Sequence, residues 1–289
     1  MTRKSIFIFT CIILLNSCQP EIKVIEKKDS LKITPASKIN FPTPTATEFL
    51  TNLFDAFYNT TIKYPEWKIV SPGLEIKEIA VKINEQLDDT VVILRINPQN
   101  FSFKILQNVK QPQTISDWLE SSKAVVLVNG NYFMENFQTA GYLVIDNKEF
   151  GELKKIYNGM FLVKNGVPEI RCLPNQTYQY SSSIEFAINN FPVMIYNSQN
   201  LLSGNSVEMD RRTVIAKDKN NNILLIVNRK PNFTLFEMAK FLEKSDLKIE
   251  TALNLDGGTS TGLAMRVNDF CYVVPSLNQI PNVIAIYKK

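Results

Sequence analysis

Short runs of β-forming residues, separated by turn signals, recur from about residue 65 to the end of this 289-residue chain. TVVILRI (90–96) and AVVLVN (124–129) are continuous apolar runs that predict buried strands, whereas YLVID (142–146) and MFLVKNG (160–166) predict half-buried ones. A strand cannot satisfy its backbone hydrogen bonds alone. The pattern therefore restricts this region to a fold made mainly of sheets.

The same region holds one clear hairpin and few helices. RTVIAKDKNNNILLIVN (212–228) predicts two strands around an asparagine-rich turn, because asparagine tolerates a left-handed backbone. ISDWLESS (115–122) predicts one helix. A second is predicted over 235–245, where Thr234 and Glu237 form the T-x-x-E pattern of a capping box. We therefore expect an α+β fold with β structure dominant: mixed sheets and a few packed helices in a single domain.

The N-terminus has the features of a secretory signal. Arg3 and Lys4 precede an apolar run, Ile6–Leu15, that is shorter than the roughly 20 residues needed to span a bilayer. A serine before Cys18 resembles the lipobox of bacterial lipoproteins, which implies that Cys18 is lipidated and begins the mature chain. The alternative is an uncleaved anchor or a buried first helix. Gln19 is similar to the residue found there in outer-membrane lipoproteins, so we expect attachment to the bacterial cell envelope, at the outer rather than the inner membrane.

Composition divides the chain into three parts. We expect a lipoprotein signal peptide over residues 1–17 and a membrane tether over 18–64, in which residues 19–47 are rich in Lys, Glu, Pro and Thr. The tether includes a predicted short helix at 46–59. The folded domain is expected over residues 65–289.

Two cysteines lie in the expected domain, Cys172 and Cys271. Outside the cytoplasm they could form a disulfide, provided that their Cα atoms lie within bridging distance. The alternative is that both are small buried hydrophobic residues.

Charge and residue usage exclude several classes of function. The chain has 32 Lys and Arg against 28 Asp and Glu and no dense basic stripe, so nucleic acid is not an expected partner. It has no histidine, which excludes Ser-His-Asp and Cys-His catalysis and His-ligated zinc. Proton transfer must then use Asp, Glu, Lys, Tyr or water. No cofactor is firmly implied, and a bound metal would be an oxygen-ligated divalent cation, Ca²⁺ or Mg²⁺.

The stretch NLDGGTST (254–261) places one carboxylate, Asp256, at the end of an apolar strand. Gly257 and Gly258 allow backbone conformations closed to other residues, and they let a ligand approach the chain closely. Successive backbone N–H groups here could form an anion nest. A P-loop is not expected, because threonine rather than lysine follows the glycines. Local chemistry leaves two interpretations open, a polar turn or an active site.

Two other stretches have a similar character. In VNGNYF (128–133) a strand ends at Asn129 and Gly130, which indicates either a ligand-binding turn or a turn whose Tyr-Phe pair enters the core. EMDRRTVIA (208–216) places Asp210 and Arg212 at the start of a strand. The arginine fork binds phosphate in bidentate fashion, although a surface salt bridge is the commoner role.

Five segments occur in the order VNGNYF, FP, RRTVIAKD, NFTLFEMAKFL and ALNLDGGTSTGLAM. Together they resemble the phosphodiester glycosidase family, and the likeness extends over about residues 65–289. The resemblance implies an α+β domain that removes a sugar from a phosphodiester, with the chemistry at the anomeric carbon. The family motifs imply substrate binding by a set of polar and glycine residues: Asn129, Gly130, Arg212, Thr213, Gly257, Gly258 and Ser260.

Glycoside cleavage typically uses two carboxyl groups. We expect Asp256 to be one, because partial burial at a strand end can tune its pKa. The second remains open among Glu208, Asp210 and Glu237, of which Glu237 also belongs to the capping box. A phosphodiester leaving group is already acidic and needs little protonation, so Arg212 could instead stabilise the departing phosphate.

Three departures from the family pattern bear on activity. Asn131, Ala216 and Thr259 stand where the family usually has glycine. The first hypothesis is a lipid-anchored envelope hydrolase acting on a glycosyl phosphodiester or a polysaccharide that contains one. The second is a non-catalytic glycan-binding lipoprotein that keeps the same fold.

Overall fold

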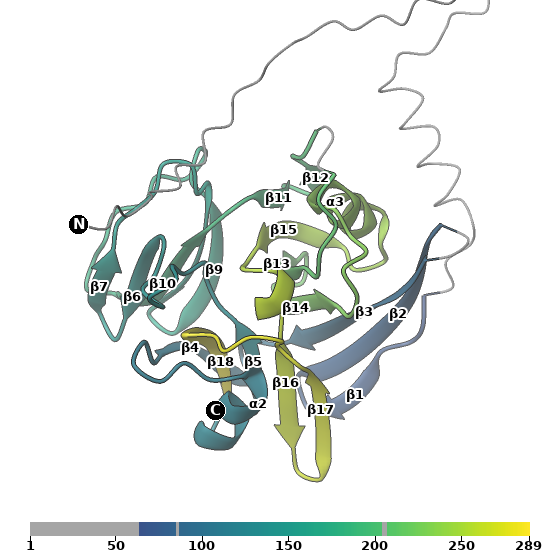
Figure 1. Ribbon diagram of the computed structural model, residues 1–289, viewed down its shortest axis with the longest axis horizontal. Coiled ribbons are helices and arrows are strands. Elements are labelled where there is room, and N and C mark those ends of the chain that lie inside the picture. Colours follow the sequence, from purple (N-terminus) through teal and green to yellow (C-terminus); the bar gives the residue numbers. More distant parts are fainter. Residues whose placement is uncertain (1–63, 85–86, 204–206) are drawn as a thin grey trace, which may run out of the picture. The chain divides into compact units, whose positions relative to one another are not determined.

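The computed structural model describes residues 64–84, 87–203 and 207–289, all within one compact unit. This part of the chain forms three sheets with two α-helices (Figure 1). The dominance of β structure is as expected, and the α+β class describes it only loosely. The predicted signal peptide, the predicted lipidation site Cys18 and the predicted tether with its short helix lie outside the described residues, except for Tyr64.

The largest sheet has eight strands, and it contains the predicted hairpin and the strand that leads to Asp256. In the hairpin turn, Asp218 Oδ1 accepts from the N–H groups of Asn220 and Asn222, both at 2.8 Å, while Asn221 takes the left-handed backbone (φ 63°). In spatial order the strands are β1 (Lys68–Ser71), β2 (Leu74–Asn84), β3 (Leu87–Ile96), β14 (Ile223–Asn228), β13 (Thr213–Asp218), β15 (Ile249–Asn254), β11 (Val193–Tyr196) and β12 (Gln199–Asn200).

Two five-stranded sheets complete the domain. The second sheet runs β7 (Lys148–Gly151), β6 (Tyr142–Ile145), β10 (Ile184–Asn190), β8 (Gly159–Lys164) and β9 (Val167–Cys172). The third runs β17 (Phe270–Val274), β16 (Leu263–Val267), β5 (Val126–Asn129), β18 (Asn282–Lys288) and β4 (Phe101–Gln107). The expectation of mixed sheets is wrong for the described strands, whose pairings are all antiparallel. Short turns join many neighbours, and such turns fix antiparallel pairing.

The central core lies where the three sheets meet. Leu253 of β15, Phe161 of β8 and Val128 of β5 belong to one cluster of buried side chains. Alternate residues of the same strands face separate apolar layers, so Leu162 of β8 packs in a cluster with Tyr178. Strands β6 and β8, predicted as half-buried, are therefore buried on both faces for most of their length. These strands are more buried than predicted because apolar side chains also cover their outer face.

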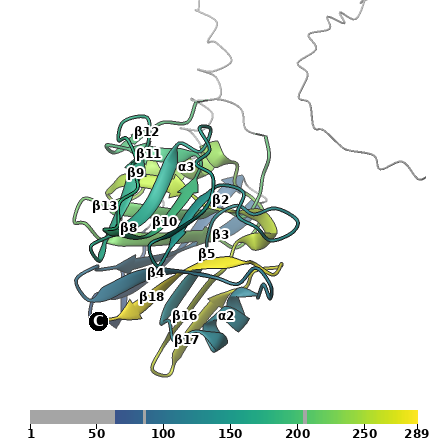
Figure 2. The ribbon, with the colours of Figure 1, turned by 90° about the vertical axis from the view of Figure 1, so that its left-hand side faces the viewer.

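Both predicted helices are present and begin with capping boxes. Helix α3 (Leu235–Lys244) starts at Thr234, whose Oγ1 accepts from Glu237 N at 3.1 Å, while Glu237 Oε2 accepts from Thr234 N at 2.8 Å. Its buried side chains pack on the outer face of the large sheet, beside β11 and β12. Helix α2 (Ile115–Ser121) covers the third sheet beside β16 (Figure 2). A 3₁₀ turn, η1 (Gly258–Ser260), follows β15.

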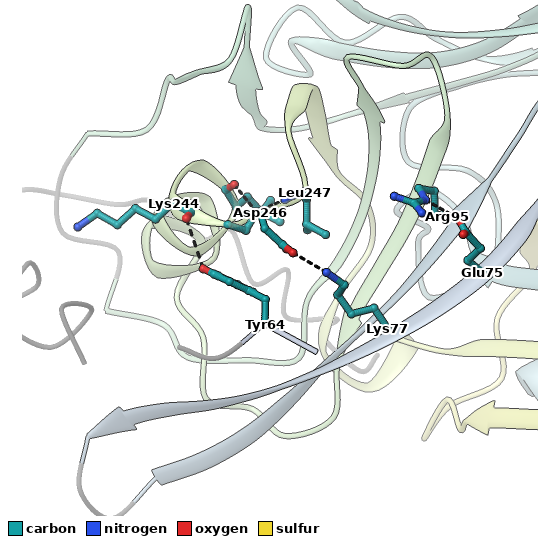
Figure 3. Close-up of polar contacts among 9 residues, drawn as sticks. Tyr64, Glu75, Lys77, Arg95, Lys244, Asp246 and Leu247 are labelled. Atoms are coloured by element: carbon teal, nitrogen blue, oxygen red, sulfur yellow. Dashed lines mark hydrogen bonds and ion pairs between the residues drawn. The ribbon is translucent and has the colours of Figure 1, made fainter. Parts of the chain in front are cut away.

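Cation–aromatic contacts fix the first described residues against the large sheet. Lys77 of β2 is 3% exposed, and its Nζ lies 2.6 Å from Asp246 Oδ2, just beyond α3 (Figure 3). The Trp67 ring lies between Lys77 (Nζ 4.8 Å from its centroid) and Arg95 (Cζ 4.1 Å), and Arg95 also pairs with Glu75. These contacts attach the start of the domain to β2 and β3.

The two cysteines of the domain are unpaired. Cys172 is buried and Cys271 is exposed, so the disulfide alternative does not hold in this structure. Within the described part of the chain, no helix is both long and apolar enough to cross a membrane.

Candidate active site

The buried amide of Asn129 joins the large sheet to the third sheet. Its Oδ1 accepts from Thr213 Oγ1 (2.8 Å) and from Gly262 N (3.0 Å), and its Nδ2 donates to the Asp256 carbonyl (2.7 Å). Asn129 is 1% exposed and Thr213 is fully buried. The end of β5, the start of β13 and the end of β15 therefore meet at one point. Asn129 and Thr213, expected to bind substrate, are engaged in holding Asp256 in place.

Gly257 and Gly258 are required because neighbouring atoms approach the backbone too closely to leave room for a side chain. Asp256 N donates to Gly130 O (3.2 Å), Gly257 N to the Asp256 carboxylate (3.0 Å), and Gly258 N to Arg211 O (2.7 Å). A Cβ on Gly257 would lie 2.8 Å from Arg211 O. Gly258 has a φ of +63°, and a Cβ there would lie 2.8 Å from the Asp210 carboxylate. The loop is thus a tight turn in which Gly258 lies against the Asp210 side chain.

The electrostatics single out Asp256. Burial raises the pKa of its carboxyl to about 6, and the nearby negative charge of Asp210 raises this pKa further, while hydrogen bonds from Ser260 and Gly257 N–H oppose the rise. A carboxyl group with a pKa near neutral pH can exchange protons during a reaction. The structure therefore brings two carboxylates together, one of them tuned by its surroundings.

Arg212 is held at the same end of the large sheet. Its Nε donates to Phe233 O (2.9 Å), a second guanidinium nitrogen donates to Glu208 O, and the side chain is 8% exposed. Burial lowers its pKa, an effect opposed first by the charge of Asp210. The charge of Arg212 also lowers the pKa of Tyr132, which burial and the charge of Asp256 raise. Arg212 and Asp210 thus lie close enough for the charge of Asp210 to act on the guanidinium, and the charges of Arg212 and Asp256 both act on the Tyr132 phenol.

Sequence reasoning did not identify the aromatic side of the site. Tyr157 stacks on Phe191, with ring centroids 5.1 Å apart, and Tyr132 lies 5.6–5.7 Å from both rings. The charge of Asp256 contributes to the raised pKa of Tyr157, after burial. Asn254 Nδ2 donates to Tyr132 Oη (2.8 Å) and to Phe191 O (3.1 Å). Tyr132 and Phe191 stand within the VNGNYF and FP segments, but neither was expected in the site, and Tyr157 carried no local signal.

Two of the departures from the family pattern leave the Asp256 turn intact. Asn131 is buried, and its amide donates to Thr139 Oγ1 at 2.6 Å. Thr259 is exposed, and its Oγ1 accepts from Asn278 Nδ2 at 2.6 Å. Each side chain is engaged with a residue outside the Asp256 turn.

Glu237 stands apart from the other expected site residues because its carboxylate is engaged in the α3 capping box. Its negative charge nevertheless makes a small contribution that raises the pKa of Arg212, against the larger lowering by burial. Among the described residues, no group of three or more His, Cys, Asp or Glu side chains is placed to hold a metal ion.

Two solved structures have a similar fold. The catalytic domain of zebrafish N-acetylglucosamine-1-phosphodiester alpha-N-acetylglucosaminidase, auto-inhibited by its pro-peptide, superposes with a TM-score of 0.61 at 17% identity, covering 78% of this chain and 87% of that one. A hypothetical protein from Synechocystis gives a TM-score of 0.54 at 17% identity, with 78% and 64% coverage. These likenesses show the fold. A comparison with curated protein sequences gives no match.

The family model for phosphodiester glycosidases matches residues 122–287, more than half of the chain. The match includes the Asn129 strand, the Arg212 and Thr213 strand, the capped helix and the Asp256 turn. This chain belongs to the phosphodiester glycosidase family.

Proposed function

We propose that this protein is a hydrolase that cleaves the bond between the anomeric carbon of a sugar and the oxygen of a phosphodiester. The observation that carries the proposal is Asp256, whose partly buried carboxyl has a pKa of about 6 beside the second carboxylate, Asp210. Family membership supports the class of reaction. The name of the zebrafish neighbour describes the same type of bond, which supports the choice of a glycosyl phosphodiester as substrate.

In the proposed mechanism, ionised Asp256 acts on the attacking side of the sugar, as general base toward water or as nucleophile. The leaving phosphate monoester is a weak base, so it departs with little protonation. Arg212 would offer its remaining N–H groups to the charge that develops on this phosphate. The Tyr157 and Phe191 rings would present an apolar face to the sugar.

The direct test is release of sugar from a synthetic glycosyl phosphodiester by the full-length protein. Turnover that depends on Asp256 supports the proposal. Binding of the same compound, measured by calorimetry, without any turnover would favour the non-catalytic glycan-binding alternative instead.

The pH profile provides a test of the pairing between the carboxylates. Because ionised Asp256 is the proposed base, kcat/KM should rise with pH through about 6 and then level off. Asp210→Asn removes a charge that raises the Asp256 pKa, so this limb should move to lower pH. Asp269→Asn, an exposed position in the β16–β17 turn, is the matched control and should leave the profile unchanged. An unmoved limb in Asp210→Asn would show that the two carboxylates are not coupled.

We further propose that the protein is lipid-anchored at Cys18 in the bacterial cell envelope, at the outer membrane. The apolar run followed by Ser17 and Cys18 supports this proposal, together with the Lys- and Pro-rich stretch that follows. Expressed in bacteria with labelled palmitate, the protein should incorporate label, and Cys18→Ser should not. Equal labelling of the two proteins would contradict the anchor at this residue.

A further inference from the structure

A small basic cavity lies directly behind the Asp256 turn. Its volume is about 280 Å³, and its lining includes three cationic residues, Arg211, Arg229 and Lys230. Apolar residues, among them Pro275 and Leu277, form the remainder of its walls. This cavity is separate from the aromatic side of the site.

The Arg211 guanidinium has spare capacity to bind an anion. Arg211 is 5% exposed, one of its terminal nitrogens donates to Pro275 O (2.9 Å), and its Nε is buried without a partner. Leaving such a donor unsatisfied is costly, and an anion in the cavity would remove that cost. Arginine forks are also well shaped for phosphate oxygens.

Burial lowers the pKa of Arg211, and the charges of Asp210 and Asp89 oppose this effect, but both carboxylates make their hydrogen bonds with backbone N–H or side-chain amide groups. Asp89 is 3% exposed and already accepts from Thr90 N (2.7 Å), Asn228 Nδ2 (2.9 Å), Arg229 N (3.1 Å) and Lys230 N (3.0 Å). Glu78 pairs with Arg229 at 3.0 Å. Asp210 accepts from the Arg211 backbone N–H and faces the Gly258 turn. Arg211 and Lys230 therefore contribute positive charge that no described ion pair offsets.

The cavity is joined to the reaction site through the backbone. The Arg211 carbonyl accepts from Gly258 N at 2.7 Å, and Arg211 also lines the cavity. This one residue therefore contacts both the Asp256 turn and the cavity. On the opposite wall, Leu277 N donates to Thr259 O at 2.8 Å. A group bound in the cavity would thus lie one turn away from the carboxylate that acts on the sugar.

We propose that this cavity binds a second phosphate group, carried by the leaving portion of the substrate. The inference rests on the proposed function for the identity of the cleaved bond. It narrows the substrate class to glycosyl phosphodiesters whose aglycone bears another phosphate, as in a polymer with phosphate in each repeat. Arg211 and Lys230 are then specificity residues.

The test compares two synthetic substrates, one with a neutral aglycone and one with an added phosphate. For the unmodified protein the added phosphate should lower KM about tenfold, the effect of one charge-assisted hydrogen bond. Lys230→Gln, at an exposed position that should not disturb folding, should abolish this advantage and leave kcat on the neutral substrate unchanged. Arg211→Met should also abolish it, and Lys219→Gln, an exposed lysine at the far end of β13, should retain it. Equal KM values for both substrates, or an advantage that survives both cavity substitutions, would overturn the proposal.

A binding measurement separates this proposal from the proposed function. Calorimetric titration of the full-length protein with inorganic phosphate should show binding that weakens at least severalfold in Lys230→Gln and Arg211→Met, but not in Lys219→Gln. If neither synthetic substrate is cleaved, the proposed function fails, and this titration still decides whether the cavity binds phosphate. Unchanged phosphate affinity in both cavity variants would remove the site.

Discussion

Asp256→Asn is expected to lower kcat/KM for a glycosyl phosphodiester by roughly 10³- to 10⁴-fold, because it removes the carboxylate that acts at the anomeric carbon. Each tenfold loss corresponds to about 1.4 kcal/mol of transition-state stabilisation. Asparagine has nearly the same shape, and its carbonyl oxygen can still accept from Gly257 N–H. The loss should therefore fall mainly on kcat, with KM little changed. Turnover equal to that of the unmodified protein would show that Asp256 has no catalytic role.

The same substitution should stabilise the fold at neutral pH. The pKa of Asp256 is raised from 3.8 to about 6 in the folded state, so folding favours the protonated carboxyl. The fold therefore has its full stability only below pH 3.8, where this carboxyl is protonated in both the folded and the unfolded state. As pH rises through about 6 the carboxyl ionises in its buried setting, which costs at most roughly 3 kcal/mol. Asp256→Asn avoids this cost, so its Tm near pH 7.5 should rise by roughly 3–8 °C. The difference should shrink as the pH is lowered toward about 4. A lower Tm at both pH values would show that the ionised carboxylate stabilises the fold.

Asn129→Ala is expected to have the largest effect on stability. It leaves Gly262 N–H and the Asp256 carbonyl without their buried partner, while the Thr213 hydroxyl keeps only its contact with Thr261 Oγ1 at 3.1 Å. An unsatisfied buried group costs about 1–3 kcal/mol, so the total loss should be roughly 3 kcal/mol or more. The free energy of unfolding from urea titration measures this loss. Because Asp256 also loses its support, kcat/KM should fall at a temperature where the variant is still folded.

Asn136→Ala is the matched control, since Asn136 is exposed and makes a local hydrogen bond to Gln138 N. It should change the free energy of unfolding by no more than about 0.5 kcal/mol. If Asn129→Ala remained folded with unaltered stability but lost substrate affinity, Asn129 would contact the substrate rather than position Asp256.

Local signals in the sequence predicted local structure well. The T-x-x-E pattern identified the start of α3, because a capping box depends on residues three positions apart. The asparagine-rich turn identified the β13–β14 hairpin for the same reason. The glycines beside Asp256 indicated that another group approaches the backbone closely. In the structure these groups are Arg211 O and the Asp210 side chain.

Features that depend on distant segments could not be predicted in this way. The burial of β6 and β8 was underestimated, because Tyr178 and Tyr180, which pack against them, come from the loop that follows β9. Asn129 carried a family motif that implies substrate binding, yet its amide faces Thr213, far along the sequence. Tyr157 joins the site through stacking on Phe191, which only the folded chain brings about.

The central claim is that the protein cleaves the bond to the anomeric carbon rather than a bond to phosphorus. The most direct measurement is hydrolysis of a glycosyl phosphodiester in water enriched in the heavy oxygen isotope. Phosphorus NMR and mass spectrometry then locate the incorporated oxygen. The released sugar should carry the label, and the phosphate monoester should carry none. Label in the phosphate would contradict cleavage at the anomeric carbon, because water would then have attacked phosphorus.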